Sequence, residues 1–86
     1  MATFLKRVTD RLAVSLKDFQ HHLEVVSGTR RITGFVISSS FFGKDDEKRQ
    51  GMLWEILEAE LSSEELQRIG AIVAMTPQEA ALHEPS

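Results

Sequence analysis

Two short segments rich in β-branched residues, HLEVV at 22–26 and RITGFVIS at 31–38, are separated by only four residues. Runs of this length and composition on either side of so short a connection predict an antiparallel β-hairpin. Gly28 lies in the connection and gives its backbone the conformational freedom that a tight turn requires. Gly34 interrupts the second run, and a glycine inside a strand predicts a bulge or a close backbone approach.

Helical periodicity flanks the hairpin on both sides. Apolar residues recur every three or four positions before it and predict a helix over about residues 2–18. A second helix is expected over about residues 45–61, because its first turn is acidic and suits the positive end of the helix dipole. Arg49 falls within the apolar arc of this second helix, where burying an unpaired cation is costly. Its guanidinium is therefore expected either to bond a loop carbonyl or carboxylate, or to contact a partner directly.

Three shorter elements complete the chain. Ser62 or Ser63 can cap a short third helix, EELQRIG, and Gly70 is its natural end. The run AIVAM at 71–75 is fully apolar and of strand length, as a buried parallel strand requires. The final TPQEAAL combines a threonine cap with proline at the first helical position, which predicts a short C-terminal helix.

These elements follow the order αββααβ, with a small helix at the end. The hairpin pairs the first two strands, and the helical crossover, which is right-handed, makes the third strand parallel to the second. The predicted fold is a single α+β domain over residues 1–86. It is a two-layer sandwich in which helices cover one face of a small three-stranded mixed sheet.

Composition limits the classes of protein that this chain can belong to. The absence of cysteine excludes disulfides, thiolate zinc sites and a cysteine nucleophile. No apolar run approaches the roughly 18 residues of a membrane span, and the start, MATFLKR, has no secretory apolar region, so we expect a cytoplasmic protein. The net charge of −3 is uneven, because residues 1–49 carry nine basic against six acidic residues and residues 50–86 carry one against seven. Such asymmetry can steer a partner if the basic residues share a face.

The segment ISSSFFGKDDEKRQGM at 37–52 joins the second strand to the second helix and holds the candidate chemistry. Its Gly43-Lys44 pair lacks the earlier glycine and the following Ser/Thr of a phosphate-binding loop, and acidic residues come next. The three serines at 38–40 lie in no nucleophile elbow, and serines at a strand end are typical of turns. Since no acid, base and nucleophile converge at a recognisable spacing, we do not expect an enzyme.

The stretch FVISSSFFGKDDEKRQGMLWEILEAEL resembles the central motif of the BolA family. In that motif a strand ending in Ser leads to F-x-G, a five-residue spacer, R-H-R and a helix with L-x-x-x-L. The matching positions are Phe41, Gly43, Arg49, Leu57 and Leu61. Together with LEVVSG upstream and TPQE downstream, the resemblance spans about residues 12–80. It implies an αββααβ fold akin to the type II KH topology, in agreement with the order expected from the residues.

The resemblance also implies a [2Fe-2S] cluster shared with a monothiol glutaredoxin and bound by the family's His/Cys residues. This chain departs from the family at those positions. Gln50 and Gly51 replace the His and second Arg of R-H-R, Gly70 stands where the family's last strand begins V-H-A-L, and the hairpin loop has neither His nor Cys. His21 and His22 adjoin the first strand, but two ligands do not make a metal site. We therefore expect no metal site and no family-type shared cluster.

Two functions remain open, and the first is a non-enzymatic BolA-like adaptor or regulator. It would act by protein contact, with a monothiol glutaredoxin as the expected type of partner. The expected partner-binding residues are Phe41, Phe42, Gly43, Lys44 and Arg49. If one of the two adjacent phenylalanines fills the core, the other can point outward as an anchor; alternatively, both pack against the first helix.

The alternative is a nucleic-acid-binding module, a transcriptional regulator that uses a KH-like surface. Its contact patch would comprise Arg30, Arg31, Lys44, Lys48 and Arg49. Three observations disfavour it: LSSEEL is acidic where KH modules carry G-x-x-G, the net charge is negative, and Gly51 replaces the family's second basic residue.

Overall fold

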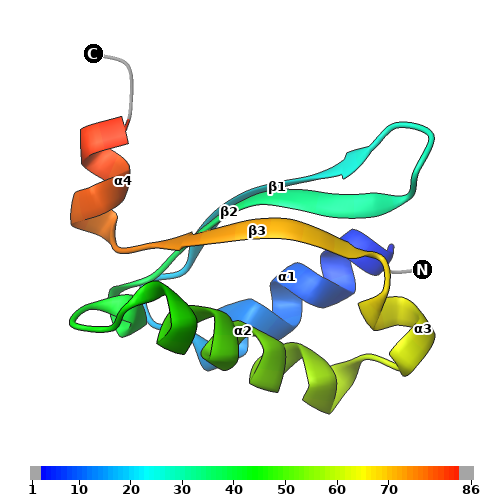
Figure 1. The fold of residues 1–86 in the computed structure, drawn as a ribbon, viewed down its shortest axis with the longest axis horizontal. Helices are drawn as coiled ribbons and strands as arrows, with labels where there is room; N and C mark the ends of the chain where they lie inside the picture. The colour runs from blue at the N-terminus through cyan, green and yellow to red at the C-terminus, as the bar shows by residue number, and fades with distance from the viewer. Residues whose placement is uncertain (1–2, 84–86) are drawn as a thin grey trace.

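A computed structural model describes residues 3–83 and confirms the expected α+β architecture (Figure 1). The order of elements matches the prediction, including the small helix at the end. The elements are α1 (Phe4–Ser15), β1 (Gln20–Val26), β2 (Arg31–Ile37), a 3-10 turn (Ser39–Phe41), α2 (Asp46–Glu60), α3 (Ser63–Leu66), β3 (Ile69–Met75) and α4 (Pro77–His83). No helix within residues 3–83 is both long enough and apolar enough to cross a bilayer.

The sheet has the strand order β1-β2-β3, antiparallel between β1 and β2 and parallel between β2 and β3. Both pairings were predicted. Gly34 pairs with Leu23 and has a φ of +136°, and a Cβ there would lie 1.9 Å from the backbone oxygen of His22. The register with β3 also shifts between Ile32 and Gly34. The predicted close backbone approach at Gly34 is therefore confirmed, whereas the extra residue of the register shift lies in β3, which advances three residues while β2 advances two.

The helices α1, α2 and α3 lie on one face of the sheet, whereas α4 stands on the opposite side at the end of β3 (Figure 1). The main core fills the space between the sheet and the first two helices. Its fully buried members come from α1, β2, the 3-10 turn and α2: Val8, Leu12, Ile32, Val36, Phe41, Leu53 and Leu57. A second, small cluster of Ile37, Met75 and Ala80 seats α4 against the other face.

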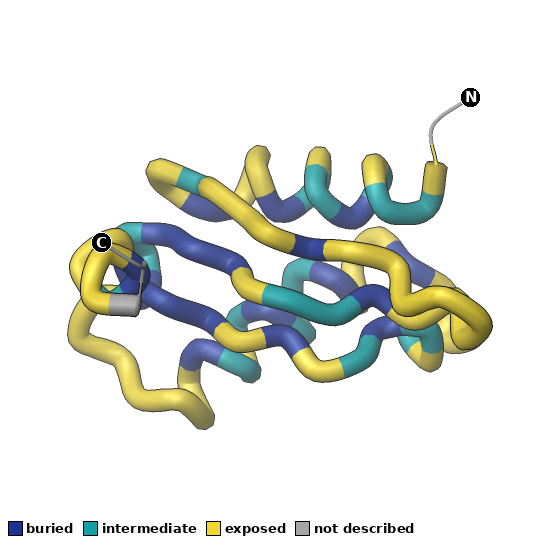
Figure 2. Tube along the Cα trace, turned by 90° about the horizontal axis from the view of Figure 1, so that it is seen from above, coloured by how far each residue is buried: buried dark blue, intermediate teal, exposed yellow. Residues whose placement is uncertain are grey.

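Burial is uneven across the sheet, because β1 contributes only Leu23 to the core (Figure 2). The other six residues of β1 are exposed. In β2 and β3, by contrast, three and four residues are buried. The sheet therefore has a well-covered side at β3 and a poorly covered side at β1.

Helix termini follow the expected capping chemistry with two differences in position. Ser62 forms a complete capping box with Glu65 at the start of α3, as predicted. The expectation that α3 ends at Gly70 is wrong, because the helix stops at Leu66 and Gly70 lies inside β3. A Cβ at Gly70 would meet Thr33 Cγ2 at 2.7 Å and Ile32 O at 3.0 Å. Close approach to β2, rather than helix termination, explains this glycine.

Helix α1 ends at Ser15, three residues before the expected end. Leu16 is already extended at the C-cap, and Asp18 has a φ of +52°, which breaks the helical path. Helical periodicity places Ala59 on the apolar arc of α2, yet it is exposed. The buried residues of α2 are Arg49, Leu53 and Leu57, spaced by four, so the apolar stripe is narrower than the sequence suggested.

Candidate functional site

The connection between β2 and α2 begins with a serine cluster that ties it to the end of α1. The Ser38 hydroxyl donates to Lys17 O at 2.6 Å and accepts from Ser40 N at 3.0 Å. The Ser40 hydroxyl accepts from Lys17 N at 3.1 Å, and the Ser39 hydroxyl donates to Asp18 at 2.9 Å. These serines satisfy turn backbone, as serines at strand ends commonly do.

The two phenylalanines that follow point in different directions. Phe41 is fully buried in the main core, whereas Phe42 is 71% exposed. Gly43 has a φ of +77°, and a Cβ on it would meet nothing within 4 Å. Gly43 is therefore needed for its backbone conformation and not for lack of space. We call Phe42–Lys44 the α2 lead-in loop; it presents an aromatic ring and an exposed lysine next to each other.

The Arg49 side chain bonds the last residue of this loop and two other elements. Its Nε donates to Lys44 O at 2.8 Å, and its Nη1 donates to Ala74 O at 3.1 Å. The same guanidinium forms a two-pronged ion pair with Glu79 of α4, at 2.6 and 3.3 Å. Arg49 is only 8% exposed, so its charge is satisfied inside the protein. The sequence left two roles open for Arg49, a hydrogen bond within the protein or a direct contact with a partner. The structure shows the first, with bonds to the carbonyl of Lys44 and the carboxylate of Glu79.

Glu79 completes this network at the first turn of α4. Its Oε1 accepts from Thr76 N at 2.8 Å, and its own N–H donates to the Thr76 hydroxyl at 3.2 Å. Hydrogen bonds from Arg49 and from Thr76 N lower the pKa of Glu79 from 4.5 to about 2. The carboxylate therefore stays charged at neutral pH and links α2, β3 and α4.

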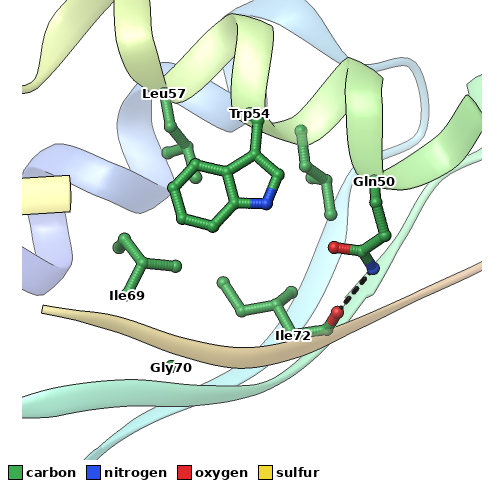
Figure 3. Close-up of a pocket in the computed structure, with 7 residues that line it drawn as sticks. Gln50, Trp54, Leu57, Ile69, Gly70 and Ile72 are labelled. Carbon is green, nitrogen blue, oxygen red and sulfur yellow. Dashed lines mark hydrogen bonds between the residues drawn. The ribbon is translucent and has the colours of Figure 1, made fainter. Parts of the chain in front are cut away.

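Gln50, the neighbour of Arg49, bonds the same strand. Its Nε2 donates to Ile72 O at 2.8 Å, next to a small pocket lined by Trp54 and Ile69 (Figure 3). The pocket has a volume of about 10 Å³, room for at most one water molecule. It is therefore too small to bind an organic ligand or cofactor.

The predicted partner-binding residues thus divide into two groups. Phe42, Gly43 and Lys44 are exposed and contiguous. Phe41 and Arg49 are buried and hold the loop in place, so in this conformation neither presents its side chain to a partner. The contribution of Gln50 was missed, because a polar residue beside a buried arginine gives no signal in the sequence that its amide reaches a strand.

The predicted nucleic-acid patch is not continuous. Arg30 and Arg31 lie at the hairpin turn, whereas Lys44 and Lys48 lie at the start of α2, at the opposite end of the domain (Figure 1). The length of β2, seven residues at about 3.3 Å each, separates the two groups by roughly 20 Å. Arg49, the fifth member, is buried. The expectation that these five residues share one surface needs this correction.

The residues near Gly70 do not fit a family-type iron–sulfur cluster. Its nearest neighbours are Thr33, Ile32 and Arg31, none of which is a thiol or an imidazole. His21 and His22 lie on β1, which β2 separates from β3. Within residues 3–83, no group of three or more His, Cys, Asp or Glu side chains gathers where it could hold a metal ion. The position that corresponds to the family's last-strand histidine therefore has no thiol or imidazole beside it.

Comparison with known proteins gives a fold. No protein-family model matches the chain, and no curated protein matches it. Among solved structures, BolA1 from Arabidopsis thaliana superposes with a TM-score of 0.73 and 22% identity, over 99% of this chain and 100% of that one. The BolA domain of SufE1 from Arabidopsis thaliana has a TM-score of 0.72 and 26% identity, over 92% and 98%.

A third structure, of a bol-like protein from Babesia bovis, has a TM-score of 0.61 and 21% identity, over 95% of this chain and 93% of that one. All three matches span nearly the whole domain. The chain has a BolA-like fold. The resemblance seen in the sequence is thus confirmed at the level of architecture.

Proposed function

We propose that this protein is a non-enzymatic BolA-like adaptor that binds a protein partner of the monothiol glutaredoxin type through the α2 lead-in loop. The observation that carries the proposal is Phe42, an aromatic ring 71% exposed on a loop whose backbone is held in one conformation. Exposed aromatic residues that are fixed in place are typical anchors of protein interfaces. The choice of partner rests on the BolA-like fold and the resemblance of the central motif.

Contacts hold the chain on both sides of Phe42. On one side, Phe41 is fully buried and the serine cluster ties the turn to Lys17. On the other, Arg49 Nε holds Lys44 O at 2.8 Å. A loop already in its binding conformation loses little conformational entropy on association, which favours affinity. Phe41 and Arg49 therefore support the contact by positioning its residues.

The surface suits a partner pocket that is apolar with an acidic rim. Phe42 would fill the pocket, and the exposed ammonium of Lys44 would meet a carboxylate at its edge. Asp45 and Asp46 follow immediately, but Asp45 is occupied in capping α2 through Lys48 N at 2.9 Å. The contact needs no ligand from this chain to a metal, so we propose that the complex forms without a cluster bound by this protein.

The experiment mixes the full chain with a monothiol glutaredoxin in its metal-free and cluster-loaded forms. Isothermal titration calorimetry measures affinity, and visible absorption follows the cluster. We expect binding to both forms with similar affinity and no change in the cluster spectrum. Failure to bind either form would contradict the proposed partner, and a new absorption band on mixing would contradict cluster-free contact.

Two variants locate the surface. Phe42→Ala removes the anchor, whereas Val14→Ala removes an equally exposed apolar side chain, 80% exposed on α1. Truncation of an interface anchor commonly costs about 2 kcal/mol or more, about a 30-fold loss of affinity. We expect that loss for Phe42→Ala and less than a twofold change for Val14→Ala. Equal effects of the two changes would place the interface elsewhere.

A further inference from the structure

The two edges of the sheet differ in what covers them. The strand order β1-β2-β3 leaves β1 and β3 each with a single neighbouring strand among the described residues. The unpaired N–H and C=O groups of an edge strand are a template for pairing with another chain unless the protein covers them. A further strand can therefore add only at an edge whose backbone N–H and C=O groups are left uncovered.

The outward groups of β3 can be assigned from its pairing with β2. Ser38 N donates to Met75 O at 2.9 Å, so Met75 faces β2. Successive residues along a strand point their backbone N–H and C=O groups to opposite sides. The backbone groups of Ile72 and Ala74 therefore point toward the free edge.

Side chains of α2 occupy that edge. Gln50 Nε2 donates to Ile72 O at 2.8 Å, and Arg49 Nη1 donates to Ala74 O at 3.1 Å. Immediately after β3, Glu79 Oε1 accepts a hydrogen bond from Thr76 N at 2.8 Å. The outward carbonyls of Ile72 and Ala74 are thus engaged by side chains of α2, which an added strand would have to displace. The β3 edge is therefore less available for strand addition than the β1 edge.

The same alternation leaves the β1 edge open. The β2 residues that face β3 are the even-numbered ones, so β1 turns Gln20, His22 and Glu24 toward β2 and points the backbone of His21, Leu23 and Val25 outward. Leu23 N donates a hydrogen bond only to Nδ1 of His21, two residues earlier on the same strand, at a long 3.4 Å. Within residues 3–83, the outward backbone groups of His21 and Val25 make no hydrogen bond outside the strand pairing.

Helix α1 lies beneath this open edge. Figure 2 shows α1 running beneath β1 and, over part of its length, outside it. Neighbouring strands lie about 4.8 Å apart, so a fourth strand beside β1 would lie over α1 instead of over solvent. Its lower side chains could then be buried.

The exposed flank of α1 suits apolar side chains. The flank that faces α2 is charged, because Arg7 and Arg11 share a hollow there with Glu60. With 3.6 residues per turn, the opposite flank carries Leu5, Thr9 and Ala13, with the exposed Lys6–Asp10 ion pair beside them. Leu5 and Thr9 are half-buried and Ala13 is exposed. The flank of α1 away from α2 therefore offers three uncharged side chains bordered by a paired lysine and aspartate.

We propose that the β1 edge is a docking site for an extended segment of a partner protein, which adds as a fourth strand. The segment would alternate apolar side chains over Leu5, Thr9 and Ala13 with polar ones beside His22 and Glu24, and a basic residue would complement Glu24. A second copy of this chain is the competing occupant, and a dimer of the protein in the absence of peptide would refute the proposal. The site is separate from the α2 lead-in loop and does not depend on its partner.

The first test uses a nine-residue synthetic peptide with three valines that alternate with threonines, and a lysine near its centre. Two further versions carry N-methyl groups, on the valine amides in one and on the threonine amides in the other. Only one of the two sets faces β1 in a strand. We expect one methylated peptide to bind at least tenfold more weakly and the other to bind within twofold of the parent. Equal behaviour of the two, or no binding of the parent at millimolar concentration, would overturn the proposal.

The second test uses the protein. Val25→Pro deletes an outward N–H without removing a hydrogen bond to β2, and Val25→Thr is its matched control. We expect at least a tenfold loss for the proline variant and less than a twofold change for the threonine variant. Amide hydrogen exchange in the unmodified protein should slow at His21, Leu23 and Val25 when the peptide binds.

Slowing at Ile72 and Ala74 instead would mean that the other edge pairs, and would refute the proposal. Circular dichroism checks that Val25→Pro is folded; if it is not, the methylated peptides and the hydrogen exchange decide alone. Phe42→Ala should bind the peptide as the unmodified protein does, which separates this site from the α2 lead-in loop.

Discussion

Arg49 Nη1 lies 2.6 Å from Glu79 Oε1, and the same nitrogen lies 3.1 Å from Ala74 O. One guanidinium thus joins the start of α2, the strand β3 and the first turn of α4. Its two partners, Ala74 and Glu79, lie 25 and 30 positions further along the chain. In the sequence, Arg49 can be recognised only as a cation on the apolar arc of a helix. The α2 lead-in loop depends on this joint through Lys44 O.

Replacing Arg49 by methionine should lower stability and loosen the loop. Methionine keeps much of the packing volume but leaves the carbonyls of Lys44 and Ala74 without their donor. At about 1 kcal/mol for each of these two bonds, and with the ion pair to Glu79 also lost, the free energy of unfolding should fall by at least about 2 kcal/mol, or about 10 °C in Tm. Urea and thermal denaturation measure this change. Lys48→Met, at an exposed position on the same helix, is the control and should change Tm by less than about 2 °C.

Acid should weaken the attachment of α4 in a defined pH range. The folded-state pKa of Glu79 is lowered from 4.5 to about 2, so its ion pair stabilises the fold fully above about pH 4.5 and is lost as the pH falls toward 2. Arg7 lowers the pKa of Glu65 too, and acts in the same direction. Glu79→Gln should flatten part of the pH dependence of unfolding between 4.5 and 2. An unchanged acid-unfolding profile in that variant would contradict the pairing.

Adding a side chain at Gly70 should destabilise the sheet because β2 is too close. The Cβ of Gly70→Ala would lie 2.7 Å from Thr33 Cγ2 and 3.0 Å from Ile32 O. Overpacking of this kind costs about 1–3 kcal/mol. Thr33→Ser removes the nearer atom, so the double variant should lose less stability than the sum of the two single variants. Strict additivity in urea unfolding would show that the two positions are not in contact.

Two glycines should respond oppositely to alanine. Gly34→Ala places a Cβ 1.9 Å from the backbone oxygen of His22 at a φ of +136°, so the hairpin must separate. We expect a loss of more than about 4 kcal/mol or no folded protein. Gly51 is in the middle of α2 with nothing within 4 Å of its Cβ position, and Gly51→Ala should stabilise by about 0.5–1 kcal/mol. Thermal unfolding of the two variants separates these outcomes, and similar effects would contradict both assignments.

The architecture could be predicted from local signals. Capping residues, the short hairpin connection and the apolar run at 71–75 each act within a few residues, and they set the element order and the strand directions. The same signals misplaced Gly70. Glycine is typical both of helix ends and of close backbone approach, and only the tertiary packing against Thr33 decides between them.

The burial of the candidate contact residues could not be predicted from the sequence. The segment 41–49 was identified, yet two of its five proposed contact residues are buried. Which of Phe41 and Phe42 enters the core depends on the turn made by the serines, a conformation that no periodicity encodes. The basic residues at 30–31 and 44–48 also lie at opposite ends of β2, and linear charge counting carries no information about such distances.

The unequal edges of the sheet limit how far assembly can proceed. Growth of a β-fibre requires that each added molecule offer a fresh edge on its far side. Here the far side is β3, where Gln50 and Arg49 already hold the outward carbonyls. If a strand adds at β1, the edge left on the far side already has the carbonyls of Ile72 and Ala74 engaged. The two α2 side chains therefore act as a built-in stop against polymerisation.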